Sequence, residues 1–173
     1  MRLLRALEYH NRNEMDVLRR NTLPLPCGPK PDMDRPQRST ALWDSYRRAT
    51  YAARTDDGEI QIHPDRCSPE LDALLNQRRV DQWAYITAYN PASRLLSEQD
   101  NVRRQQALVQ VVQDRGLTFF EGASVLDAAK WPPEPSLLVL GIPADDARAL
   151  GRQFGQLAIV VGRLDQPARL VEC

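Results

Sequence analysis

This sequence is short of the residue types and segments that reveal a function directly. Its 173 residues include three cysteines and two histidines. No apolar run approaches the roughly 20 residues that a transmembrane helix needs, so membrane association is not expected. Cys27, Cys67 and Cys173 lie far apart in the chain, which is more typical of reduced thiols than of a disulfide framework. We therefore expect a cytoplasmic location.

Motifs for metal, nucleophile and phosphate chemistry are also missing or incomplete. His63-x-Asp65-x-Cys67 contains metal-ligand residue types, but no second cluster completes four ligands, so we expect no metal. Ser93 and Ser97 have no paired histidine for a serine triad. The sequence has neither a G-x-G-x-x-G motif nor a P-loop. We therefore expect no cofactor, and these patterns leave open whether the protein is an enzyme.

The charged residues balance overall, with 23 basic and 23 acidic side chains, but they are unevenly distributed. Residues 1–54 contain 11 basic and 6 acidic side chains (net +5), and residues 55–173 contain 12 and 17 (net −5). The basic segment either lies on the acidic part or meets an outside partner. Arginines outnumber lysines by 21 to 2, which suits phosphate contacts. Coding bias produces the same ratio, so nucleic-acid binding is not favoured.

The first 40 residues differ in character from the rest. Residues 1–22 carry apolar side chains loosely at helical spacing, which predicts a weakly amphipathic helix. Residues 24–36 contain five prolines, which interrupt regular structure. We therefore divide the chain into an N-terminal helix and Pro-rich arm, residues 1–40, and a single α+β domain, residues 41–173.

The pattern after residue 41 predicts strands and helices in a definite order. A β-hairpin around Asp57-Gly58 and a helix from Ser68-Pro69 come first. The next segments indicate strand, helix, strand, strand, helix and strand, with bounds 83–89, 97–115, 117–121, 136–142, 143–155 and 157–162, then a short strand at 168–171. Residues 122–135 are expected to form a loop. The predicted class is α+β: a ferredoxin-like β-α-β-β-α-β core with both helices on one face of an antiparallel sheet, preceded by the extra hairpin and helix.

This topology brings polar side chains from distant segments to one rim of the sheet. Arg104 extends the core-facing side of its helix, and a half-buried arginine needs a partner, for which Glu134 is the acid best placed. Small-ligand sites are mostly apolar concavities with a few convergent polar groups. The candidate ligand-binding residues are therefore Asn90, Asn101, Arg104, Trp131, Glu134 and Gln156. The alternative is purely structural, because amides at element ends often satisfy backbone groups and an Arg–Glu pair often fixes a loop.

Several motifs occur in order along the domain. They are Thr87-Ala88-Tyr89-Asn90-Pro91-x-Ser93, then Leu96, Asn101, Arg104 and Leu108, then Trp131-Pro132-x-Glu134-x-Ser136, Leu140-Gly141 and Phe154-Gly155-Gln156-x-Ala158. Over roughly residues 42–163 the chain resembles the bacterial domain-of-unknown-function family 3293. The resemblance implies a bacterial origin. It implies no particular chemistry, because the family has no assigned activity.

The sequence thus predicts a bacterial cytoplasmic protein that binds a small anionic or nucleotide-like ligand at one rim of its sheet. Arg104 would bind an anionic or carbonyl group, and the amides and Glu134 would orient it. The alternative hypothesis is a protein-interaction or regulatory module that acts through the basic N-terminal arm, residues 1–40, or through an open sheet edge.

Overall fold

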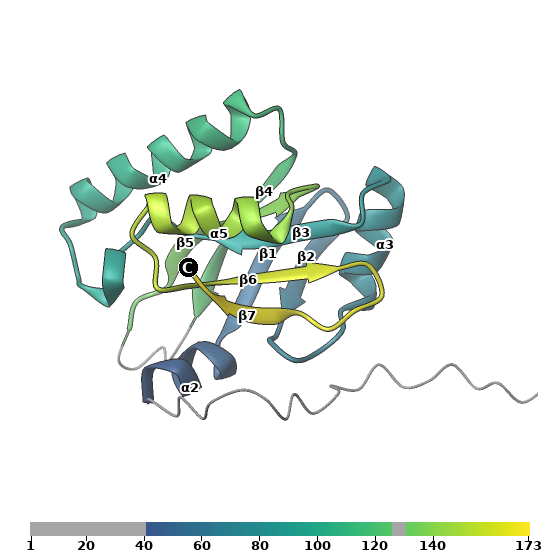
Figure 1. The fold of residues 1–173 in the computed structure, drawn as a ribbon, viewed down its shortest axis with the longest axis horizontal. Coiled ribbons are helices and arrows are strands. Elements are labelled where there is room, and N and C mark those ends of the chain that lie inside the picture. Colours follow the sequence, from purple (N-terminus) through teal and green to yellow (C-terminus); the bar gives the residue numbers. More distant parts are fainter. Residues whose placement is uncertain (1–40, 126–130) are drawn as a thin grey trace, which may run out of the picture.

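The computed structural model describes residues 41–125 and 131–173 (Figure 1). The predicted N-terminal helix and Pro-rich arm, residues 1–40, lie outside the described residues. The described elements are, in chain order, α2 (Ala41–Arg48), β1 (Thr50–Thr55), β2 (Gly58–Ile62), α3 (Pro69–Arg78), β3 (Gln82–Ile86), the 3-10 turn η1 (Pro91–Ser93), α4 (Glu98–Asp114), β4 (Phe119–Val125), β5 (Glu134–Leu140), α5 (Ala144–Gln153), β6 (Ala158–Arg163) and β7 (Arg169–Glu172).

The seven strands form one sheet in the order β2-β1-β4-β5-β3-β6-β7, and every neighbouring pair is antiparallel. The predicted hairpin around Asp57-Gly58 is confirmed, because β1 and β2 pair from Tyr51–Ile62 to Thr55–Gly58. The short C-terminal strand also pairs back on its neighbour, as predicted. The chain therefore has an α+β fold built on an antiparallel sheet.

Helices α4 and α5 cover one face of this sheet (Figure 1). Leu108 and Val112 of α4 and Leu150 of α5 are fully buried against alternating residues of the central strands, such as Ile86 and Val139. Ser97 starts α4 as predicted, because its hydroxyl oxygen accepts a hydrogen bond of 3.1 Å from the Asp100 backbone N–H. The apolar stripes of both helices and this sheet face form one core.

The opposite face of the sheet is concave and holds a second core. Helix α3 packs Leu71, Leu74 and Leu75 into it. The segment after β2 is joined to the segment before β7 by two backbone hydrogen bonds. Ala168 N donates to Arg66 O at 2.9 Å, and Ala168 O accepts from Asp65 N at 2.8 Å. Because β2 and β7 are the two edges of the sheet, these bonds fasten its curled edges together at one point.

Most predicted bounds differ by one or two residues from those of the structure, and the larger differences lie near the candidate site. The expected loop over residues 122–135 is wrong at both of its ends, because Gly122 pairs with Ser136 and Ser124 pairs with Glu134. The β4–β5 ladder therefore extends past the glycine and the proline that suggested a loop. The strand predicted to reach Tyr89 ends as β3 at Ile86, so Asn90 belongs to a turn rather than to a strand end.

Helix α2 was not predicted, although Trp43 and Tyr46 within it pack against the concave core as partly buried rings. None of its residues is fully buried. Its eight residues would be marginal as an isolated helix, since helicity at this length depends on tertiary contacts. The sequence pattern of α2 was therefore too short to indicate a helix.

The cysteines differ from expectation. Cys67 is disulfide-bonded, and among the described residues Cys173 is free. The expectation of three reduced thiols is wrong for Cys67, and this argument for a cytoplasmic location no longer holds, because disulfides are rare in reducing compartments. Within residues 41–125 and 131–173, no helix combines the length and apolarity that crossing a membrane would require.

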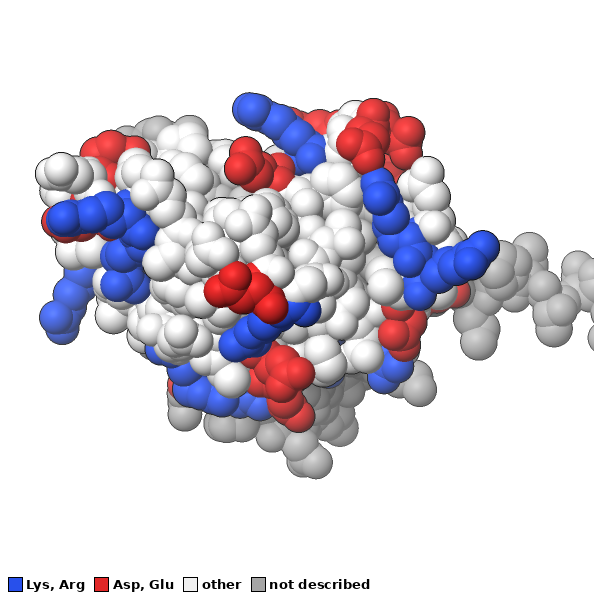
Figure 2. Space-filling view, turned by 90° about the horizontal axis from the view of Figure 1, so that it is seen from above, with Lys and Arg blue, Asp and Glu red and all other residues white. Residues whose placement is uncertain are grey.

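Acidic and basic side chains are interspersed over the face that Figure 2 presents, with uncharged surface between them. Proteins that bind nucleic acid electrostatically usually gather basic residues on one face. The face in Figure 2 has no such continuous basic area among the described residues.

Candidate functional site

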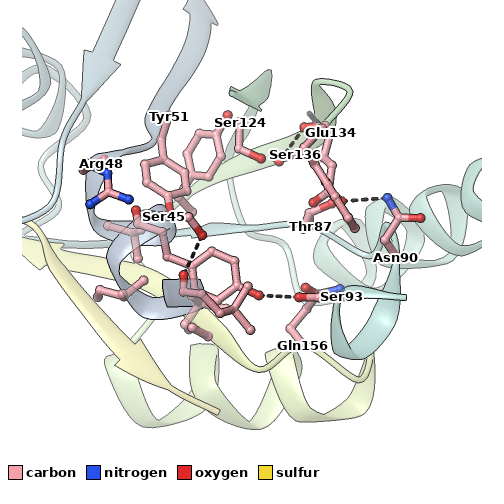
Figure 3. Close-up of a pocket in the computed structure, with 18 of the residues that line it drawn as sticks. Ser45, Arg48, Tyr51, Thr87, Asn90, Ser93, Ser124, Glu134, Ser136 and Gln156 are labelled. Atoms are coloured by element: carbon pink, nitrogen blue, oxygen red, sulfur yellow. Dashed lines mark hydrogen bonds between the residues drawn. The ribbon is translucent and has the colours of Figure 1, made fainter. Parts of the chain in front are cut away.

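A cavity of about 730 Å³ lies on the concave side of the sheet, next to α2 (Figure 3). Its size is within the range of pockets that hold small organic ligands. Helix α2 contributes Ser45, Tyr46 and Arg48 to the lining. The remaining walls come from β1, from β3 to β7, and from the turns that follow β3 and α5: Tyr51, Tyr85, Thr87, Asn90, Ser93, Ser124, Trp131, Glu134, Ser136, Gln156, Ala158, Ile159, Val160 and Leu170.

The structure brings the predicted site residues together but places them in two groups. Asn90, Trp131, Glu134 and Gln156 line the cavity. Asn101 and Arg104 do not line it, and they lie behind Asn90 and the loop that follows β3. The predicted convergence of distant segments is therefore seen, whereas the prediction that all six residues face one ligand is not met.

Asn90 is the centre of the hydrogen-bond network behind the cavity. Its side chain is 4% exposed and donates from Nδ2 to Glu134 Oε1 at 2.7 Å. Its Oδ1 accepts from Asn101 Nδ2 at 2.9 Å and from the Leu96 backbone N–H at 3.0 Å. Asn101 Oδ1 in turn accepts from the Asn90 backbone N–H at 2.9 Å. Asn90 thus ties the turn after β3 to α4 and to β5.

Arg104 has a different role from the one predicted. Its Nε donates to Ala88 O at 2.9 Å, and its Nη2 donates to Phe154 O. The expected pairing of Arg104 with Glu134 is not seen, because the guanidinium donates to these two backbone carbonyls and Arg104 does not line the cavity. Arg104 thus joins the loop after β3 to the end of α5, which is the kind of contact that the structural alternative describes.

The turn after β3 has an unusual backbone that places Ser93 in the cavity wall. Asn90, Ala92 and Ser93 have φ angles of 44°, 51° and 55°, in the left-handed region that non-glycine residues seldom adopt. The turn is held in this form because the Ala92 N–H donates to Gly155 O at 2.8 Å and the Ser93 hydroxyl bonds the Tyr46 hydroxyl at 2.5 Å. Such backbone strain is commonly found at functional sites.

Gln156 fixes the opposite side of the same turn. Its Nε2 donates to Tyr89 O at 2.8 Å, which follows the predicted proximity of the segment after α5 to the end of β3. Its side-chain oxygen accepts no hydrogen bond from any described residue. Gln156 therefore orients the turn and still offers one acceptor beside the cavity.

Glu134 is the carboxylate in the cavity wall, and Figure 3 shows it joined to Asn90. The residue is 8% exposed. Oε1 accepts from Asn90 Nδ2 at 2.7 Å and from Trp131 Nε1 at 2.9 Å. Burial raises the pKa of Glu134, and the two hydrogen bonds offset part of that rise. Oε2 has no hydrogen-bond partner within the described part of the chain.

The hydroxyl groups of the wall donate mainly to the backbone. Tyr51 donates to Tyr46 O at 2.9 Å, and Tyr85 donates to Ala52 O at 2.6 Å. Thr87 and Ser136 donate to Pro135 O and Glu134 O at 2.7 and 2.9 Å. Burial raises the pKa of both Tyr51 and Tyr85, so they keep these protons at neutral pH. Their oxygens therefore remain available to the cavity only as acceptors.

Sequence reasoning missed the hydroxyl-bearing residues of the wall. Ser124 and Ser136 are 4% and 2% exposed and lie on the same sheet face as Tyr85. The alternation Glu134-x-Ser136 could have indicated a polar stripe at the start of an apolar strand. Tyr46 could not have been found in this way, because its place in the wall depends on how α2 packs.

Residues 86–159 match the family model described as "Protein of unknown function (DUF3293)". This match supports the predicted family assignment over 74 of the 173 residues, and it does not test the predicted bacterial origin. The DUF3293 match contains Asn90, Asn101, Arg104, Trp131, Glu134 and Gln156, but it ends before β7 and begins after α2 and β1. Part of the cavity wall therefore lies outside the matched residues. No curated protein and no solved structure matches the chain.

Proposed function

We propose that this DUF3293 chain binds a small organic molecule in the cavity beside α2, with Glu134 as its polar anchor. The observation that carries this proposal is the Glu134 carboxylate, which is 8% exposed and has one oxygen held and the other without a partner among the described residues. A carboxylate in this setting costs folding free energy, which is a common property of functional groups. The rest of the described wall combines apolar and aromatic side chains with almost as many polar ones, so it offers a ligand both contact area and hydrogen-bonding groups.

The expected anionic or nucleotide-like ligand has lost its main support. That expectation placed Arg104 against an anionic group, whereas Arg104 donates to two backbone carbonyls away from the cavity. Among the described lining residues, Arg48 is the only lysine or arginine, and it is exposed. Within the described part of the wall, an anionic group could therefore meet a cation only at Arg48.

We also propose that β3 to β6 with α4 and α5 form a ferredoxin-like unit. In support, these strands stand in the order β6-β3-β5-β4, all neighbours are antiparallel, and both helices pack on one face. This is the arrangement of a β-α-β-β-α-β fold. In this proposal α2, β1, β2 and β7 are additions that enclose the cavity on the other face.

A screen of small molecules by thermal shift tests the proposed binding. We expect compounds that stabilise the wild-type chain to lose most of this effect in Glu134→Gln and in Ser124→Leu, which would fill the cavity. Glu121→Gln is the matched control, because Glu121 is an exposed carboxylate on β4. Stabilisation that is equal in all four proteins would contradict a site in this cavity.

The pH dependence of stability tests whether Glu134 is buried with Oε2 lacking a hydrogen-bond partner among the described residues. Its pKa is raised in the folded state, so the stability it contributes is full below the ordinary glutamate range and is lost as pH rises through the raised pKa. Tyr46 and Tyr51, the titratable groups facing it, have raised pKa values and stay neutral in this range. We expect Glu134→Gln to become more stable relative to the wild type between pH 4 and pH 7, as measured by urea unfolding. A difference that does not change with pH would contradict the prediction.

An interaction module remains the alternative proposal, through the N-terminal arm or through the sheet edges β2 and β7. Deleting residues 1–38 would then abolish capture of a partner. Because the deletion also removes Cys27, and Cys67 is disulfide-bonded, a Cys67→Ser variant of the full chain is the control for any change in thermal stability.

A further inference from the structure

The buried carboxylate of Glu134 has no countercharge within the described residues. The ion pairs there join Arg78 to Asp56, Arg103 to Asp100, Arg148 to Asp145 and Arg163 to Asp81. Arg48 lines the same cavity, but Figure 3 shows it well apart from Glu134, and no hydrogen bond or ion pair joins them. Burying an ionised carboxylate without a nearby cation is costly, so this position favours a cation that arrives with a ligand.

The polar groups beside Glu134 also favour a hydrogen-bond donor. Tyr51, Tyr85 and Ser136 each give their hydroxyl proton to a backbone carbonyl, which leaves their oxygens as acceptors for a ligand. The Thr87 oxygen already accepts from the Tyr89 backbone N–H at 3.0 Å. Gln156 uses its amide nitrogen on Tyr89 O and retains its oxygen. Near Glu134 a ligand rich in N–H groups would therefore meet several acceptors, whereas a ligand rich in acceptors would find its main donor in the Arg48 guanidinium, which lies apart from Glu134 (Figure 3).

Aromatic rings make up much of the remaining wall. Trp131 and three tyrosines line the cavity, and the rings of Tyr51 and Tyr85 meet edge to face with centroids 5.3 Å apart. Aromatic rings attract cations through their π electrons, most strongly where water is excluded. Apolar side chains such as Val160 and Leu170 complete this part of the wall. The wall therefore suits a ligand with an organic body and a positively charged, N–H-bearing head.

We propose that the cavity selects a small organic ammonium compound whose N–H groups bind Glu134 Oε2 and the surrounding hydroxyl oxygens. This inference rests on the proposed function and adds the charge class of the ligand. The Asn90 and Trp131 hydrogen bonds hold Oε1, so the carboxylate is fixed with Oε2 available to the ligand. A charge-assisted hydrogen bond formed there would be stronger than a neutral one.

Titration calorimetry at pH 7.5 with three probes of similar shape tests the inference on the full chain. The probes are 2-phenylethylammonium, 2-phenylethanol and 3-phenylpropanoate, which differ in the charge of the head group. We expect the ammonium probe to bind at least about tenfold more tightly than the alcohol. We expect Glu134→Gln to lower the affinity of the ammonium probe to about that of the alcohol, and to leave the affinity of the alcohol within about twofold.

Two control variants accompany Glu134→Gln. Glu121→Gln removes an exposed carboxylate of β4 and should leave the affinity for the ammonium probe unchanged. Lys130 is four residues before Glu134 in the sequence and lies outside the described residues. The inference predicts that Lys130→Gln also leaves the affinity unchanged. A tenfold gain in Lys130→Gln would mean that a lysine of the chain itself supplies the countercharge, and it would overturn the inference.

The outcomes separate this inference from the proposed function. Binding of the alcohol or the carboxylate as tightly as the ammonium probe, or ammonium binding that is indifferent to Glu134→Gln, would overturn the inference and leave a small-molecule site in place. Absence of ammonium binding up to millimolar concentration would overturn it as well. The proposed function fails separately, if no compound of the thermal-shift screen distinguishes the wild type from Ser124→Leu.

Discussion

Asn90→Ala is expected to lower the free energy of unfolding by about 3 kcal/mol. The substitution removes the acceptor of Asn101 Nδ2, whose residue is 4% exposed, and one of the two donors to Glu134 Oε1. Leaving buried polar groups without partners costs about 1–3 kcal/mol for each. Alanine is also disfavoured at the Asn90 φ of 44°, by about 1 kcal/mol. Urea unfolding followed by circular dichroism measures the sum.

Two comparisons divide this effect into its causes. Asn90→Gly removes the same hydrogen bonds but accepts a positive φ, so the difference between the glycine and alanine variants reports the backbone contribution. Asn76→Ala removes an exposed asparagine of α3 and should change stability by less than about 0.5 kcal/mol. A loss below about 1 kcal/mol in Asn90→Ala would show that the network contributes little to the fold.

Gly122→Ala should destabilise the protein at least as much, by about 3 kcal/mol or more, for a steric reason. A Cβ at residue 122 would lie 1.9 Å from the carbonyl oxygen of Ala52 and 2.8 Å from the Tyr85 hydroxyl. The Ala52 carbonyl oxygen belongs to the backbone of β1, so it cannot move aside as the end of a flexible side chain would. The β1–β4 pairing must open for the methyl group to fit, and this pairing carries Tyr51 and Ser124 in the cavity wall.

The neighbouring residue supplies the control for Gly122→Ala. Ala123→Gly changes the same strand by one methyl group in the opposite sense, and glycine in a strand costs about 0.5–1 kcal/mol. Thermal unfolding of both variants compares the two effects. Stability of Gly122→Ala within about 1 kcal/mol of the wild type would mean that β1 does not approach β4 as closely as the structure shows.

The two largest expected effects concern the same feature, the wall that positions Glu134. Asn90 holds Glu134 Oε1 from behind, and Gly122 allows β1 and β4 to approach each other beside it. A folded protein would tolerate a glutamine at residue 134 with less desolvation cost. This cost supports the proposal that the carboxylate serves to bind a ligand.

Much of the sheet could be predicted from local patterns. The Asp57-Gly58 turn between alternating residues indicated β1 and β2, and Ser97 with the apolar spacing of Leu108 and Val112 indicated α4. The end of β4 and the start of β5 could not be predicted in this way, since glycine and proline, which occur here as Gly122 and Pro135, usually interrupt strands. There the ladder continues because Gly122 permits a close approach of β1, which only the packed sheet reveals.

The candidate site shows the same division. The sequence correctly indicated that Asn90, Glu134 and Gln156 meet, because the order of strands and helices determines which segment ends share a rim. The predicted partner of Arg104 was wrong. Which acceptors a guanidinium reaches depends on differences of a few ångströms, and the order of elements along the chain does not determine these. Arg104 donates to Ala88 O and Phe154 O, and no ion pair joins it to a carboxylate of the described residues.

The sequence by itself determined the family, the α+β class and the main helices and strands, since these depend on periodicity and on motifs that are local in the chain. Only the tertiary structure decided that α2 and the curled strands enclose a cavity, that Tyr46 and Ser93 meet in its wall, and that Glu134 has no cation beside it among the described residues. These features depend on distances between groups far apart in sequence. Such distances are set by how the two faces of the sheet pack, and no local pattern contains them.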